Sequence, residues 1–144
     1  MIKLIFKYLI IFASIFLLTQ CDYRTSSQKR FSRTLDIKIP KDVEVIKDEY
    51  QDMWQDFAIV YEIKLTREEM SDLIKSIKDS KFYNDSAFVK DYVTQEMFIE
   101  QGDMKAVWAK MDSGYIFQND FDRDAYSAQI DTINLVAKFD ESHD

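Results

Sequence analysis

The run from residue 57 to residue 65 constrains the fold more than any other part of this chain. Apolar side chains occupy every second position there: Phe57, Ile59, Tyr61, Ile63 and Leu65. A period of two is typical of a β-strand, because successive side chains point to opposite faces of a sheet. The intervening positions change from apolar Ala58 and Val60 to charged Glu62 and Lys64. The pattern therefore predicts a strand that is covered on both faces along its first half only.

An amphipathic helix is predicted directly after this strand, over about residues 67–79. Thr66 followed by Glu69 is the residue pattern of a capping box, which marks the start of a helix. Apolar residues then recur with a helical period, at Met70, Leu73, Ile74 and Ile77. We expect the helix to pack this apolar stripe on the sheet and to turn its mixed charges to solvent.

Turn signals from residue 93 onward predict a C-terminal β-meander. Gly102 and Gly114 each separate two strand-like runs and fit hairpin turns. A third hairpin is predicted at residues 131–134, because apolar residues alternate on both sides of that polar segment. A helix over residues 124–138 is the competing interpretation. The fold class that follows is α+β, with one helix packed on a mainly antiparallel sheet.

The segment before the long strand gives weaker signals. Leu35, Ile37 and Ile39 alternate with polar residues and predict a short strand that ends at Pro40. Residues 48–56 are acidic and irregular, and residues 80–92 show no firm period, so no strand or helix is predicted in either stretch.

The counts of cysteine, glycine and histidine exclude several classes of chemistry. One cysteine among 144 residues rules out an internal disulfide framework, a Cys-rich zinc site and a CxxC redox pair. The only two glycines are too far apart for a phosphate-binding loop. The only histidine, His143, is next to the last residue, where fraying is expected. We predict no catalytic residue and no cofactor; a hydrolase without a recognisable motif stays open, because carboxylates are abundant.

Residues 1–20 have the pattern of a secretory signal peptide. Lys3 and Lys7 precede an uncharged apolar run from Tyr8 to Leu18. A basic start followed by a short apolar run is typical of such signals. The run is shorter than the roughly 20 residues that a membrane-spanning helix needs. The pattern predicts export.

The string Leu18-Thr19-Gln20-Cys21 resembles the lipobox of bacterial lipoproteins. The resemblance implies that residues 1–20 are removed, that the sulfur of Cys21 is joined to diacylglycerol, and that the new amine is acylated by a palmitate-like chain. Two or more acyl chains anchor a protein stably. The implied location is a bacterial membrane, with the chain facing the periplasm or the cell exterior. A secreted protein without lipid is the competing interpretation.

Charge divides the rest of the chain into two parts. Residues 22–33 hold four basic residues and one acidic residue, whereas residues 34–144 hold 13 basic and 25 acidic residues. We expect residues 21–33 to be the lipidated cysteine and a flexible basic tether, because a segment with few apolar residues cannot offset the entropy of ordering. Residues 34–144 are then a single globular α+β domain. Its acidity excludes nucleic acid and fits a basic protein partner or a divalent cation.

Four aspartates near the C-terminus have the spacing of a calcium-binding loop. Asp120, Asp122, Asp124 and Asp131 stand at positions 1, 3, 5 and 12 of an EF-hand pattern. Ala125 stands where that loop needs glycine, and the last position lacks the bidentate glutamate. A calcium-binding envelope protein is therefore an alternative, and a solvated acidic turn competes with it.

Trp54 is the residue that we single out for binding a partner. It lies in the acidic stretch before the long strand, where an apolar anchor on a wet loop can serve recognition. Covering a sheet edge is the competing role. The function predicted from these features is that of a non-catalytic, lipid-anchored envelope protein. Its acidic domain would bind a protein partner in an inhibitory, immunity or accessory role.

Overall fold

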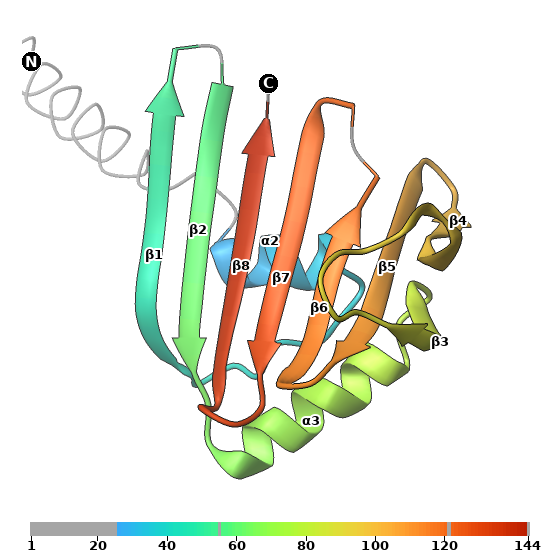
Figure 1. The fold of residues 1–144 in the computed structure, drawn as a ribbon. Helices are drawn as coiled ribbons and strands as arrows, with labels where there is room; N and C mark the ends of the chain where they lie inside the picture. Colours follow the sequence, from blue (N-terminus) through green and yellow to red (C-terminus); the bar gives the residue numbers. More distant parts are fainter. Residues whose placement is uncertain (1–25, 55, 121, 144) are drawn as a thin grey trace, which may run out of the picture.

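The structure is a computed structural model that describes residues 26–54, 56–120 and 122–143. These residues form two α-helices, one short 3₁₀ turn and eight strands (Figure 1). In chain order the elements are α2 (Ser27–Thr34), β1 (Glu44–Met53), β2 (Asp56–Lys64), α3 (Arg67–Lys78), β3 (Tyr83–Phe88), η1 (Gln95–Met97), β4 (Ile99–Gln101), β5 (Met104–Met111), β6 (Gly114–Asn119), β7 (Asp124–Asp131) and β8 (Val136–His143).

The strands form one mainly antiparallel sheet in the order β1-β2-β8-β7-β6-β5-β3, with β4 paired to β5. Only the β3–β5 pair is parallel among the strand pairs of the described residues. The last strand, β8, lies between β2 and β7 and so joins the first hairpin to the C-terminal meander. The protein is thus α+β, as its alternating patterns predict.

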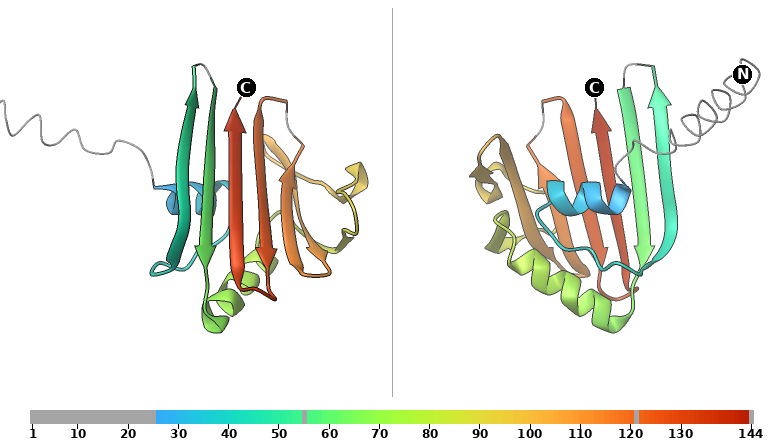
Figure 2. Two further views of the ribbon diagram at one scale, coloured as in Figure 1. Left: turned by 60° about the vertical axis from the view of Figure 1, so that its left-hand side comes forward. Right: turned by 180° about the vertical axis from the view of Figure 1, so that it is seen from behind.

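Both helices cover the same face of the sheet (Figure 2). The main core lies beneath them and includes Phe31 of α2, Leu73 of α3 and Trp108 of β5, each with no exposed surface. The indole Nε1 of Trp108 donates to the backbone oxygen of Leu35, so the one polar atom of this buried side chain is satisfied. The predicted capping box of α3 is confirmed, because Thr66 and Glu69 each accept from the other's backbone N–H.

The opposite face of the sheet is only partly covered. Val107 and Ala109 of β5 point there and pack with Ala87 and Val89 in a second, smaller core. The segment between β3 and β4 lies over β5 and β6 on this side (Figure 1). Residues of β2, β8 and β7 on the same face form the open sheet face. The sheet therefore has one face that the two helices cover and one face that is open over β2, β8 and β7.

The three predicted hairpins are confirmed, and the helix over residues 124–138 is wrong. Strands β7 and β8 pair from Asp124–His143 to Asp131–Val136. Asp131 closes their turn by accepting from the backbone N–H groups of Ile133 and Asn134, at 2.9 and 2.8 Å. The alternation of apolar residues on both sides of the polar segment predicted this hairpin correctly, because its inward positions, such as Ala128 and Phe139, are buried.

The start of the domain differs from the prediction in three places. Of the expected flexible tether, residues 27–33 belong to helix α2, because Ser26 caps the helix and Phe31 enters the core next to Phe139 at a ring distance of 5.4 Å. Residues 21–25 of the tether lie outside the described residues. Residues 35–39 alternate between inside and outside as predicted, but they form no strand. In the acidic stretch of residues 48–56, for which no element is predicted, residues 48–53 form the second part of strand β1, whose pairing with β2 compensates for its weak apolar pattern.

Candidate functional site

The tip of the β1–β2 hairpin carries the most exposed large apolar side chain of the described residues. Trp54 is 99% exposed and has a backbone φ of 74°. A left-handed backbone is unfavourable for a residue with a Cβ atom, by about 1–2 kcal/mol. Exposing a tryptophan also forgoes the burial of about 150–250 Å² of surface. The two-residue turn between the paired residues Met53 and Asp56 requires such a backbone at its first residue, but it does not require an exposed indole there.

Strand β1, which leads to this tip, is an exposed and acidic sheet edge. Its outward side chains include apolar Val45 (50% exposed) and Ile46 (51% exposed). A register shift between Val45 and Lys47 makes the strand irregular there. The strand carries the acids Glu44, Asp48, Glu49 and Asp52. Its one cation, Lys47, lies 3.1 Å from a carboxylate oxygen of Glu49. Strand β1 and Trp54 together are called the acidic hairpin below.

A buried ionic cluster lies on the helix-covered face near the same end of the sheet. The side chain of Glu141 has no exposed surface. Both of its oxygens accept from Arg30, at 2.5 Å from Nε and 2.5 Å from Nη2. His143 contacts Glu141 through Nε2 and Asp124 through Nδ1, the latter at 2.5 Å. The burial of the carboxylate is therefore compensated by a cation and a ring N–H.

Aromatic rings enclose this ionic cluster. Phe57 stacks on the ring of His143 with a centroid distance of 4.1 Å, and the Arg30 guanidinium lies 5.4 Å from the Phe57 centroid. Burial, together with the negative charges of Glu141 and Asp124, raises the pKa of Tyr126 to about 12. His143 is the last residue of β8 and pairs with residues of both β2 and β7, so it lies within the sheet.

The sequence contains a signal for part of this cluster. Phe139, Glu141 and His143 alternate with polar residues along β8, so the apolar inward set continues into two titratable residues. Inward-facing charges at the end of a strand require partners. One partner, Arg30, could not be assigned because its segment was interpreted as a tether.

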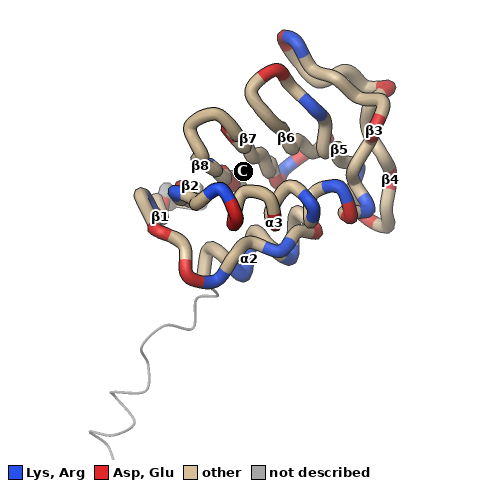
Figure 3. The backbone as a smooth tube through the Cα atoms, turned by 90° about the horizontal axis from the view of Figure 1, so that it is seen from below, with Lys and Arg blue, Asp and Glu red and all other residues tan. Residues whose placement is uncertain are grey.

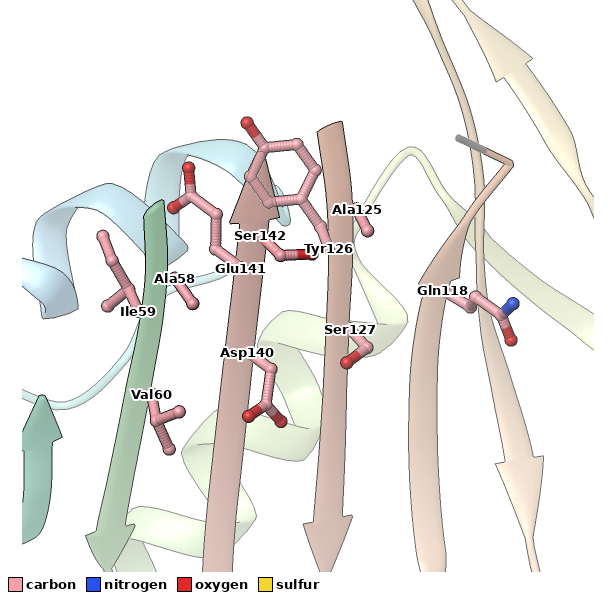
Figure 4. Close-up of a pocket in the computed structure, with 10 residues that line it drawn as sticks. All are labelled: Ala58, Ile59, Val60, Gln118, Ala125, Tyr126, Ser127, Asp140, Glu141 and Ser142. Atoms are coloured by element: carbon pink, nitrogen blue, oxygen red, sulfur yellow. The ribbon is translucent and has the colours of Figure 1, made fainter. Parts of the chain in front are cut away.

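The open sheet face is hollowed between β2, β8 and β7. A shallow cavity of about 330 Å³ lies over small side chains, among them Ala58, Ala125 and Ser142 (Figure 4). Asp140, Ser127 and Gln118 are polar residues that also line it. The surface that lines the cavity is mostly small and apolar, and no set of titratable side chains among the described residues converges on it.

The four aspartates of the predicted calcium loop do not come together. Strand β7 runs from Asp124 to Asp131, and its rise of about 3.3 Å per residue separates these two residues by roughly 23 Å. Asp120 pairs with Lys105 at 3.0 Å, and Asp124 pairs with His143. Asp122 is exposed in the short β6–β7 connection. Within residues 26–54, 56–120 and 122–143, no three acidic or histidine side chains are arranged to hold a metal ion.

The predicted lipidation site, Cys21, lies outside the described residues. In the part of the chain that the structure describes, neither helix is long and apolar enough to cross a membrane. Comparison with protein-family models, with curated proteins and with solved structures found no match for this chain. The function is therefore inferred from how the described residues of this chain are arranged.

Proposed function

We propose that this chain is a lipid-anchored envelope protein that acts by binding another protein through its acidic hairpin. One observation carries the proposal: Trp54 stands 99% exposed in a left-handed conformation at the tip of an acidic edge strand. Tryptophan is among the residues most enriched in the energetic centres of protein interfaces. The energetic cost of holding it in water has a reason when a partner buries it.

Charge indicates what kind of partner the hairpin binds. Four acidic residues and one basic residue lie on β1, and Asp56 begins β2. Like charges on a partner would be repelled, and a basic surface would be attracted and oriented during approach. The partner is therefore a basic protein in the envelope. An inhibitor or immunity protein against a basic enzyme and an accessory subunit both use this chemistry.

The anchoring part of the proposal depends on Cys21 and is tested separately. The Leu18-Thr19-Gln20-Cys21 string supports lipid attachment, and the basic start with its apolar run supports export. A Cys21→Ser variant should leave the membrane fraction and lose incorporation of a labelled fatty acid. An unchanged membrane fraction would contradict lipid anchoring.

The binding part is tested by crosslinking in intact cells. A photoreactive amino acid at Gln51, an exposed residue on β1, should capture one dominant protein. Capture should disappear in a Trp54→Ala background. The matched control is Tyr92→Ala, which removes an aromatic residue that is 74% exposed elsewhere on the surface and should leave capture unchanged. Broad capture of many proteins, or equal loss in both variants, would contradict the hairpin as the binding site.

A further inference from the structure

Charge is distributed unevenly over the folded domain. Residues 26–41, which form α2 and the segment after it, contain five basic residues and one acidic residue. Residues 42–143 contain 11 basic and 23 acidic residues. The acidic domain thus has a basic surface where its folded part begins, and Figure 3 shows Lys and Arg along α2 and the stretch that follows it.

Four of these basic residues are exposed and are together called the α2 basic face: Lys29, Arg33, Lys38 and Lys41. Arg33, Lys38 and Lys41 line one groove, whose other wall includes Asp72, Lys75 and Asp79. Lys29 and Arg33 are four residues apart on α2, on the side of the helix opposite the buried Ser27 and Phe31. None of the four side chains forms an ion pair within the described residues.

The remaining charges of this segment have partners inside the protein. Arg30 is bound to Glu141, and the carboxylate of Asp36 accepts from the backbone N–H of Lys81 at 2.8 Å. The α2 basic face is therefore not needed to neutralise acids of its own segment.

The position of Cys21 places this face near the proposed anchor. Ser26, the N-cap of α2, is five positions after Cys21, so a fully extended chain spans at most about 18 Å between them. The eight residues of α2 add only about 12 Å along the helix axis. A lipid at Cys21 would keep Lys29 and Arg33 close to the headgroup layer.

We propose that the α2 basic face lies against the anionic phospholipid headgroups of the anchoring membrane. The inference rests on the proposed lipid anchor at Cys21 and adds an orientation to it. Basic residues are attracted to an anionic surface within about a Debye length, roughly 10 Å at 0.1 M salt, and the acidic remainder is repelled. The helix layer therefore faces the membrane, and the open sheet face points away from it.

The test uses the lipidated protein in vesicles that contain phosphatidylglycerol. A fluorescent label is attached to one introduced cysteine, either Lys38→Cys on the basic face or Ser127→Cys on the open sheet face. A quencher is placed on the lipid headgroups. Quenching at position 38 should exceed quenching at position 127 several-fold. The difference should shrink at high salt and in vesicles of phosphatidylcholine alone.

Charge reversal supplies the matched control. Lys29→Glu, Arg33→Glu and Lys41→Glu together should abolish the difference between the two labels. Lys90→Glu, Arg123→Glu and Lys138→Glu change the net charge equally at exposed residues outside α2 and the segment after it, and they should preserve the difference. Melting temperatures of both triple variants verify that the fold is kept. Equal quenching at both positions in lipidated wild-type protein would overturn the orientation alone, whereas absence of lipid at Cys21 by mass spectrometry would overturn the anchor and the orientation with it.

Discussion

Arg30 in α2 and Glu141 in β8 are 111 residues apart in sequence, yet two guanidinium nitrogens of Arg30 lie 2.5 Å from the two carboxylate oxygens of Glu141. The pair joins the first helix of the domain to its last strand. Glu141 has no exposed side-chain surface, whereas the Arg30 side chain is 32% exposed. Hydrogen bonding to Glu141 raises the pKa of Arg30 above its ordinary value, so the guanidinium stays charged.

Removing Arg30 should destabilise the domain strongly. Arg30→Met leaves a buried carboxylate without its cation, and breaking such a pair costs about 3–5 kcal/mol. The lower end applies, because Arg30 is partly exposed and His143 still contacts Glu141. The measurement is urea unfolding followed by tryptophan fluorescence.

Two further variants distinguish charge burial from loss of packing. Arg30→Met combined with Glu141→Leu should recover most of the lost stability, because no buried charge is left. Lys47→Met, which breaks the exposed pair with Glu49, should cost less than about 1 kcal/mol. Equal losses in the single and the double variant would show that the carboxylate is not the cause.

Alkaline pH should weaken the fold through Tyr126. Its pKa is raised from 10.0 to about 12, so the folded state holds the phenol proton more tightly than the unfolded state. The stabilisation is complete below the unfolded pKa and is lost as pH rises through the folded pKa. The melting temperature should therefore fall between about pH 10 and pH 12, the interval between the ordinary and the raised pKa.

The control is Tyr126→Phe, which keeps the ring and removes the titrating group. Tyr61 and Tyr83 also have raised pKa values, mainly because of burial, so the wild-type protein loses stability from several phenols. The difference between wild type and Tyr126→Phe isolates one of them. Parallel curves for the two proteins across this interval would contradict the assignment.

Acidic pH should weaken the fold through Asp131, which closes the β7–β8 turn. Hydrogen bonds from Asn134, backbone first and then side chain, hold the pKa of Asp131 below its ordinary value. A lowered pKa stabilises the fold above the unfolded pKa, and this contribution is lost as pH falls through the folded pKa. Asp131→Ala should lower the melting temperature at neutral pH. On acidification, the melting temperature of this variant should fall less than that of the wild-type protein. Identical acid curves would show that the turn does not depend on the carboxylate.

The parts of the fold that the sequence predicted correctly are those with local patterns. Helix α3 has a capping box and a helical period, and β2 has a period of two, so each pattern requires only neighbouring residues. Strand β1 has no such pattern, because it is an edge strand with few buried positions and takes its structure from pairing with β2.

Helix α2 and the pairing of Arg30 with Glu141 could not be predicted from the sequence for a different reason. Phe31 is one apolar residue among polar ones, and its burial depends on Tyr61 and Phe139, which are distant in the chain. The same holds for Arg30, whose partner lies on the last strand. Contacts of this range leave no periodic trace, whereas the exposure of Trp54 agrees with its acidic, polar surroundings.

Trp54→Gly should separate stability from binding. The φ of 74° at Trp54 is unfavourable for a side chain with a Cβ atom and easy for glycine, and the indole is 99% exposed, so the fold loses no packing. The substitution should raise the unfolding free energy by up to about 1 kcal/mol. The same variant should lose capture of the protein partner. Chemical unfolding measures the first effect, and in-cell crosslinking at Gln51 measures the second. A less stable variant would show that Trp54 stabilises the fold. Retained capture would show that Trp54 does not contribute to binding the partner.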